Sequence, residues 1–263
     1  MGQRANCAKL PHMRRLLALF LLFTPAAFAD HAAQLIAFTE GRYGEAVTLA
    51  EAEPSADNLA FAARSLLAEA MSAPDHIPPQ ALAEQAEAYA RRAIAAEPGH
   101  VEGRLQLAIA LSLRARPLSN REARRSGFGS EAKTLAEAVL KDDPANAYAH
   151  GFMAVWNIEV VRRGGSLGSA VMGASVRQGK RHYAHAIAAD ADDASTHWQY
   201  ARALTALNAK KYRNDIDTAL AAALAAHPGS ALERTMQARA LELRTALDTQ
   251  SRKACERLAE TML

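Results

Sequence analysis

Apolar positions recur with a helical period along most of the chain. Tyr43, Ala46, Val47 and Ala50 follow the spacing i, i+3, i+4, i+7, and the same spacing returns within 132–140 and 216–224. Because an α-helix has about 3.6 residues per turn, this spacing places one apolar stripe on each helix, which a neighbour must cover. Runs of β-branched residues that alternate with polar ones are nearly absent. The pattern therefore predicts an all-α fold without a sheet.

The predicted helices end in similar short sequences. An apolar helix end is followed by an acidic residue or a histidine, then usually by proline and by small or polar residues. These ends centre on Pro54, Pro98, Pro144, Ala191 and Pro228, so they recur 44, 46, 47 and 37 residues apart. Proline cannot continue a helix but fits the turn before the next one. Recurrence on this scale predicts a helical repeat array.

One segment resembles a known repeat family. Residues 81–111, ALAEQAEAYARRAIAAEPGHVEGRLQLAIAL, resemble the second helix of one tetratricopeptide repeat followed by the first helix of the next. Ala86, Ala90, Ala93 and Pro98 stand where that family keeps small residues and a closing proline. The resemblance covers most of residues 33–229. It implies a right-handed superhelix of about five helix pairs plus a C-terminal helix.

The resemblance departs from the family pattern in two ways. No repeat has the usual early Trp–Leu–Gly–Tyr set intact, and three units exceed the family period of about 34 residues. The excess lies between the first and second helix of a unit, in residues 72–80, 114–132 and 161–180. Such inserts often form a binding face. The other interpretation is that they are solvent-exposed loops, whose extra length adds little entropic cost to folding. In the glycine-rich third insert, 164–179, we expect Leu167, Val171, Met172 and Val176 to pack back onto the repeats.

The first residues have the three parts of a secretory signal. Arg14 and Arg15 precede an apolar run over 16–23, and Ala27-Phe28-Ala29 forms a cleavage site. The run is far shorter than the ~20 residues that cross a bilayer. We predict a signal peptide over 1–29, cleavage after Ala29 and export to the periplasm. A repeat domain over 30–249 and a helical tail over 250–263 follow, with no transmembrane segment.

Export changes the charge and the cysteine count. The leader carries four positive and no negative residues, so the formal net charge of +3 becomes −1 after cleavage. That balance argues against nucleic acid as a partner. Cys7 leaves with the leader, and Cys255 remains as a single thiol that we predict to be inert. One cysteine excludes an internal disulfide, a CxxC redox pair and a zinc finger.

The middle of the chain holds the candidate binding residues. Aromatic side chains gather there, and we expect most of them in the core, with Tyr148, Trp156 and Trp198 as candidate groove anchors. Arg162 and Arg163 could present paired cations to an acidic partner, although such pairs are usually a solvated edge.

Two motifs in the same region suggest chemistry. His182 and His185 stand at i, i+3 on one helix face and could supply two metal ligands, with a third from His150 or His197. The other interpretation is that they are surface or groove-lining histidines. We predict no metal site. The sequence GGSLG at 164–168 matches GxSxG around Ser166, yet a nucleophile elbow needs a strand that an all-α array does not supply. We therefore predict no catalytic residue and no cofactor.

The sequence favours an interaction protein. A stacked array offers an extended curved surface without chemistry, so we predict a periplasmic scaffold or adaptor that holds a protein or peptide in its concave groove. The alternative is a small-ligand or metal-binding accessory protein of a transport system, which a cavity beside Trp156 and Trp198 would favour. A hydrolase that uses Ser166 is the third interpretation.

Overall fold

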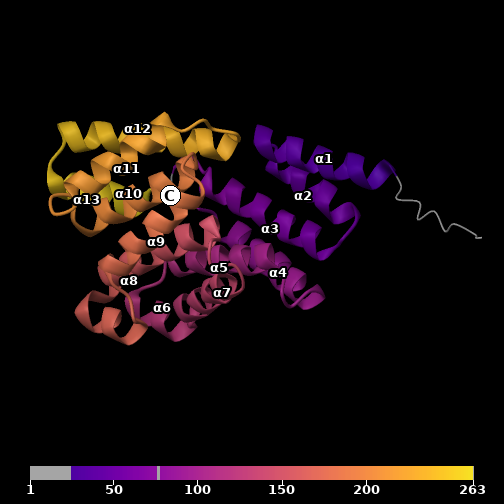
Figure 1. The fold of residues 1–263 in the computed structure, drawn as a ribbon, viewed down its shortest axis with the longest axis horizontal. Coiled ribbons are helices and arrows are strands. Elements are labelled where there is room, and N and C mark those ends of the chain that lie inside the picture. Colours follow the sequence, from indigo (N-terminus) through magenta and orange to yellow (C-terminus); the bar gives the residue numbers. More distant parts are fainter. Residues whose placement is uncertain (1–24, 76–77, 263) are drawn as a thin grey trace, which may run out of the picture.

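The computed structural model describes residues 25–75 and 78–262. Within those ranges the chain forms thirteen α-helices and no strand (Figure 1). This confirms the all-α prediction. The helices are α1 (Pro25–Glu40), α2 (Tyr43–Ala52), α3 (Ala56–Met71), α4 (Gln80–Ala96), α5 (Val101–Ala115), α6 (Asn120–Ser126), α7 (Phe128–Asp142), α8 (Ala147–Met172), α9 (Val176–Ala189), α10 (Ala194–Asn208), α11 (Arg213–Ala225), α12 (Ala231–Thr249) and α13 (Arg252–Thr261).

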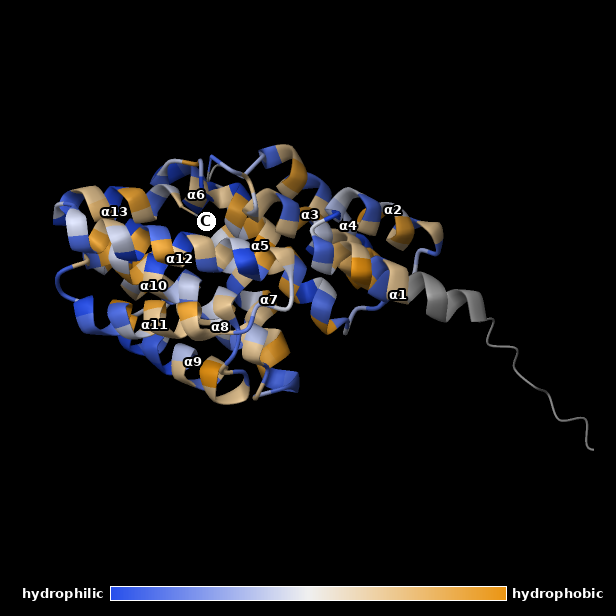
Figure 2. Ribbon diagram, turned by 90° about the horizontal axis from the view of Figure 1, so that it is seen from above, coloured by the Kyte–Doolittle hydropathy of each residue, from blue (hydrophilic) through white to orange (hydrophobic). Residues whose placement is uncertain are grey.

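The helices stack as successive pairs. The pairs are α1/α2, α3/α4, α5/α7, α8/α9 and α10/α11, and each pair packs on the next. Side-chain caps start the first helix of several pairs: Ser55 accepts from the backbone N–H of Asn58 at 3.1 Å, and Asn146 accepts from that of Ala149 at 3.0 Å. Such caps satisfy backbone donors that a helix start leaves free. Hydrophobic and hydrophilic residues share most helices (Figure 2), as amphipathic repeat helices require.

The pairs approach closely because small residues line their contacts. Ala86, Ala90 and Ala93 are fully buried, as the repeat pattern predicts. Gly179 on α9 is a sharper case, because a Cβ there would meet the Ala154 carbonyl oxygen and Ile158 Cγ1, both at 3.0 Å on α8. Glycine is therefore what permits the close α8/α9 contact.

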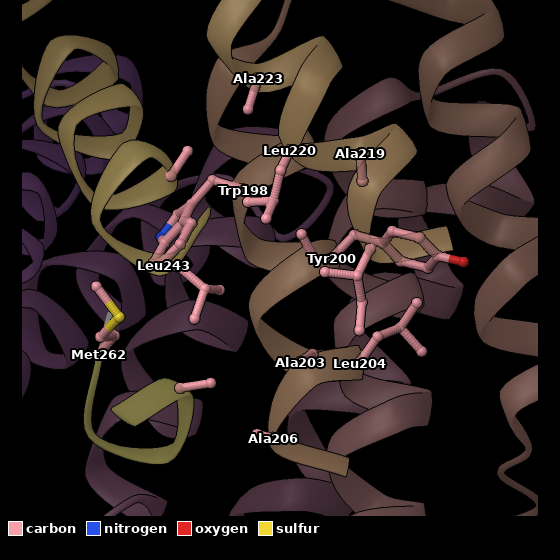
Figure 3. Close-up of a cluster of buried hydrophobic side chains, with 14 of the residues drawn as sticks. Trp198, Tyr200, Ala203, Leu204, Ala206, Ala219, Leu220, Ala223, Leu243 and Met262 are labelled. Carbon is pink, nitrogen blue, oxygen red and sulfur yellow. The ribbon is translucent and has the colours of Figure 1, made fainter. Parts of the chain in front are cut away.

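The largest buried cluster surrounds α10. Trp198 and Leu204 of α10 pack with Leu220 of α11, Leu243 of α12 and Met262, which follows α13 (Figure 3). All five side chains are fully buried. The C-terminal helix is therefore part of the main core.

The last helices close the array. Figure 1 shows α12 and α1 along one edge of the molecule with their ends adjoining, and the two helices are in contact. Arg239, 4% exposed, donates to the carbonyl oxygens of Met71 and Ala73, the latter at 2.8 Å. Arg234 donates to the Thr39 carbonyl oxygen at 3.3 Å. Helix α12 thus joins the first helices of the array to the last pair, α10/α11.

The inserts differ from the expected loops. Residues 114–132 contain α6 and the start of α7, and residues 161–180 continue α8 past a kink at Gly165 before α9 begins. Met172 and Val176 pack against core clusters as predicted. Leu167 and Val171 are 71% and 73% exposed, so the prediction that they pack back onto the repeats is wrong. They lie on the part of α8 that follows the kink.

The two ends of the chain carry the remaining predictions. Residues 1–24 of the predicted signal peptide lie outside the described residues, and the predicted cut after Ala29 falls within α1. At the other end, α12 finishes at Thr249 and α13 occupies most of the predicted tail. Among the described helices, none has the length and apolar character to cross a membrane.

Candidate functional site

Tyr148 lies in the first turn of α8. Its side chain is 57% exposed, yet the surrounding protein desolvates the phenol and raises its pKa. The charges that act on this pKa come from four other parts of the array: Arg64 of α3, Asp193 before α10, Glu102 of α5 and Glu233 of α12. We call these five residues the mouth. An exposed aromatic side chain is a good recognition anchor.

A pocket of about 500 Å³ lies beside the mouth and shares Arg64 and Glu102 with it. Its other walls come from α1, α2, α3 and the turn before α5, with Gln34, Phe61 and His100 among the lining residues. The volume falls within the range of small-molecule sites, roughly 300–1,000 Å³.

His100 is held in one orientation and one tautomer. The backbone N–H of Gly103 donates to His100 Nδ1 at 3.0 Å, so Nδ1 carries no proton. Nε2–H then donates to Asp57 Oδ1 at 2.9 Å. His100 is 7% exposed and caps α5, so it fixes the position of the exposed Asp57 carboxylate at the pocket edge.

Arg64 is the cation of this region and is already engaged. Its guanidinium lies over the Phe38 ring at 4.8 Å from the centroid, and Nη1 is 3.8 Å from Glu102 Oε1. An arginine that stacks on an aromatic ring and pairs with a carboxylate holds both side chains in position. The pocket therefore has more acidic than basic side chains, because Arg64 is its single basic lining residue.

The predicted histidines do come together. His150 stacks on His185 with centroids 4.8 Å apart and hydrogen-bonds His182 through both Nδ1 atoms at 2.9 Å. Because His150 Nε2–H donates to the Pro144 carbonyl oxygen at 3.0 Å, His182 Nδ1–H is the donor between the neutral rings. Burial, followed by the charges of His150 and His185, lowers the pKa of His182 to about 4.

This histidine cluster does not form a metal site with His197. His197 lies elsewhere, where its Nδ1 accepts from the Tyr183 hydroxyl at 2.6 Å. Over residues 25–75 and 78–262, no group of three or more His, Cys, Asp or Glu side chains could hold a metal ion. Both ring nitrogens of His150 are engaged with protein atoms.

Arg162 and Arg163 face inward instead of presenting paired cations. Arg162 contacts Glu159 Oε2 at 2.7 Å and Glu260 Oε1 at 3.0 Å, and Arg163 donates to the carbonyl oxygens of Ala115 and Leu118 at 3.0 and 2.5 Å. They hold the segment after α5 and the last helix in place. Both guanidinium groups are therefore engaged within the fold, and their role toward an acidic partner stays a prediction.

The same network fixes α13. Arg202, 2% exposed, contacts Glu159 Oε1 at 2.9 Å and donates to the Ala259 carbonyl oxygen at 3.2 Å. Arg116 donates to the Glu260 carbonyl oxygen at 2.8 Å. Burial, followed by the charge of Arg202, lowers the pKa of Arg116 to about 9. Arg116 after α5 and Arg202 of α10 therefore bind carbonyl oxygens of α13, and Arg162 of α8 pairs with the Glu260 carboxylate.

Both tryptophans are core residues. Trp198 is fully buried, and Trp156 is 6% exposed with its indole N–H donating to the Gly129 carbonyl oxygen at 3.0 Å. Neither lines the pocket beside the mouth. Of the predicted aromatic anchors, Tyr148 alone is exposed.

Ser166, the residue of the hydrolase interpretation, is exposed and follows the kink at Gly165. Asp193 and His197 follow it in the chain order of a hydrolase triad, and both are engaged in other contacts. Asp193 caps α10 by accepting from the Ser195 backbone N–H at 2.9 Å, and His197 bonds Tyr183. Cys255 is 1% exposed, and burial raises the pKa of its thiol.

Comparison with known proteins supports the fold. Neither a protein-family model nor a curated protein matches the sequence. Among solved structures, a thermophilic TPR protein of Thermus thermophilus aligns with a TM-score of 0.55 and 19% identity, over 82% of this chain and 96% of that chain. The chain folds as a tetratricopeptide-like repeat array. At this identity the likeness shows the fold alone, and it confirms the resemblance seen in residues 81–111.

Proposed function

We propose that this chain is an exported adaptor that holds a segment of another protein at the mouth. Arrays of this fold offer curved surfaces for protein–protein interaction. The observation that carries the proposal is the exposed aromatic side chain of Tyr148 in the first turn of α8, on which charges of α3, α5, α12 and the turn before α10 act. Export rests on the leader-like sequence over residues 1–29.

Affinity capture from the envelope fraction of the source organism tests the proposal. The bait is the full chain, beside a Tyr148→Ala variant and a Leu167→Ala variant. Tyr148 and Leu167 are both exposed, but Leu167 lies after the kink of α8, within the third insert. We expect one partner that Tyr148→Ala loses and Leu167→Ala keeps. Loss with Leu167→Ala alone would move the site to the insert, and no partner with any folded bait would contradict the adaptor.

A small-ligand accessory protein is the second candidate. The pocket volume of about 500 Å³ favours it, because this value suits a small molecule as well as part of a peptide. A free ligand that binds without any flanking peptide would support this candidate. The two proposals place the ligand in neighbouring parts of one region.

A further inference from the structure

Gln34 lines the pocket with an unmet hydrogen-bonding requirement. Its side chain is 2% exposed, and its Oε1 atom has no hydrogen-bond partner within the described structure. Buried polar groups almost always have partners, so an unpaired one beside a pocket points to a missing donor.

The neighbouring amide fixes which atom of Gln34 is free. Asn58 Nδ2 donates to the Glu53 carbonyl oxygen at 2.7 Å, so Asn58 turns its Oδ1 toward Gln34 and accepts from Gln34 Nε2 at 3.4 Å. Turning the Gln34 amide over would bring two oxygens together. The free atom is therefore an acceptor.

The charge of the pocket also favours a positively charged hydrogen-bond donor. Glu53, Asp57 and Glu102 line it against a single Arg64, which gives a formal charge of −2 with His100 neutral. Arg64 is already paired with Glu102 at 3.8 Å and stacked on Phe38. An incoming cation would meet carboxylates that the protein itself leaves in excess.

The remaining wall is apolar. Leu49 and Phe61 are half-buried and line the pocket beside the polar groups. A long side chain can lay its methylene stem on such a wall while its charged head reaches polar groups.

We propose that this pocket binds a cationic group on an apolar stem, with the ammonium or guanidinium head toward the carboxylates and Gln34. The inference rests on the proposed function and names its partner: a protein segment with a lysine or arginine that enters beside Tyr148. A free organic amine has the same chemistry, and the experiment separates the two sources.

Titration of the ¹⁵N-labelled full chain by NMR tests the inference. The probes are N-acetyl-Ala-Lys-Ala-amide, its glutamate counterpart and n-butylammonium chloride. We expect the lysine peptide to shift the Gln34 side-chain amide signals and the glutamate peptide to leave them unchanged. Equal affinity for n-butylammonium would assign the pocket to free amines, and tighter binding of the peptide would assign it to a protein segment.

Variants give the sign of each contribution. Gln34→Leu and Glu102→Gln should weaken binding of the cationic probe about fivefold to tenfold. Arg64→Gln should tighten it, because the change removes a like charge; a merely structural role would weaken it. The control Glu137→Gln removes an exposed acid of α7 that pairs with Lys133, and it should change nothing.

Two results would overturn the inference. The first is no shift of pocket signals with either cationic probe at about 20 mM, a concentration that detects even weak binding. The second is equal binding of the lysine and glutamate peptides. A partner that is captured through Tyr148 by the Gln34→Leu chain would keep the proposed function while this inference failed.

Discussion

Glu159→Gln should destabilise the fold and loosen its last helix. Glu159 is the shared carboxylate of Arg162 and Arg202, at 2.7 and 2.9 Å, and its side chain is 21% exposed. Burial alone would raise its pKa, but Arg202, Arg162 and Arg116 outweigh burial and lower it to about 2. Removing the carboxylate leaves Arg202, with a side chain 3% exposed, without its ionic partner.

The magnitude follows from that pKa. Between about 2 and the ordinary value of 4.5, at about 1.36 kcal/mol per pH unit, the ionised form is favoured in the folded chain by about 3 kcal/mol. Because the folded pKa is the lower one, this stabilisation is present above pH 4.5 and is lost as the pH falls toward 2. Breaking a buried pair on one side costs a similar amount, about 3–5 kcal/mol.

Urea denaturation at pH 7 and pH 3 measures the effect. We expect Glu159→Gln to lose about 3 kcal/mol of unfolding free energy at pH 7 and clearly less at pH 3. The control Glu137→Gln removes an acid that is 52% exposed and should cost less than about 0.5 kcal/mol. In a Cys7→Ser background, the buried Cys255 of α13 should also react faster with a thiol reagent in Glu159→Gln. A loss below about 1 kcal/mol at pH 7, or one independent of pH, would refute the reasoning.

Three further predictions use other parts of the fold. His182 has a folded pKa of about 4 against an ordinary 6.5, so the fold favours its neutral form. The free energy of unfolding is therefore unaffected by this group above pH 6.5 and falls by about 2 kcal/mol at pH 5. His182→Gln should abolish this loss in unfolding measurements, whereas His227→Gln, at an exposed histidine, should not. Gly179→Ala should cost about 1–3 kcal/mol, since its Cβ would meet α8 at 3.0 Å; Gly168→Ala, with open space, should be neutral or stabilising in thermal melts. Gln34→Leu removes an unpaired acceptor together with the long hydrogen bond to Asn58, so the two effects should largely cancel and stability should change by less than about 1 kcal/mol; a large drop in the melting temperature would contradict the account of the pocket.

The helix pattern was readable in the sequence because it is local. Apolar spacing and the recurring prolines predict amphipathic helices and their turns, and buried Ala86, Ala90 and Ala93 confirm the small-residue stripe. The closure by α12 was not readable. It depends on Arg234 and Arg239 reaching backbone carbonyls of Thr39 and Met71, and an arginine in a helical pattern normally indicates a solvated position.

The pocket was missed for a related reason. Its residues come from α1, α2, α3 and the start of α5, and only the folded array brings them together. One sign of the pocket was available in the sequence. Ala37 and Phe38 follow Gln34 at i+3 and i+4, so Gln34 is a polar residue on an apolar stripe. The prediction that the two tryptophans are groove anchors failed because large aromatic residues are found in cores as well as in interfaces.

Photo-cross-linking at position 148 tests the central claim most directly. Benzoylphenylalanine replaces Tyr148 in one chain, the exposed Leu167 of α8 in a second and the exposed Lys210 after α10 in a third. Each chain is expressed in the source organism and irradiated. The account predicts that one envelope protein is linked through position 148 and that position 210 gives no link. Linking through position 167 alone would contradict it and place the partner on the insert.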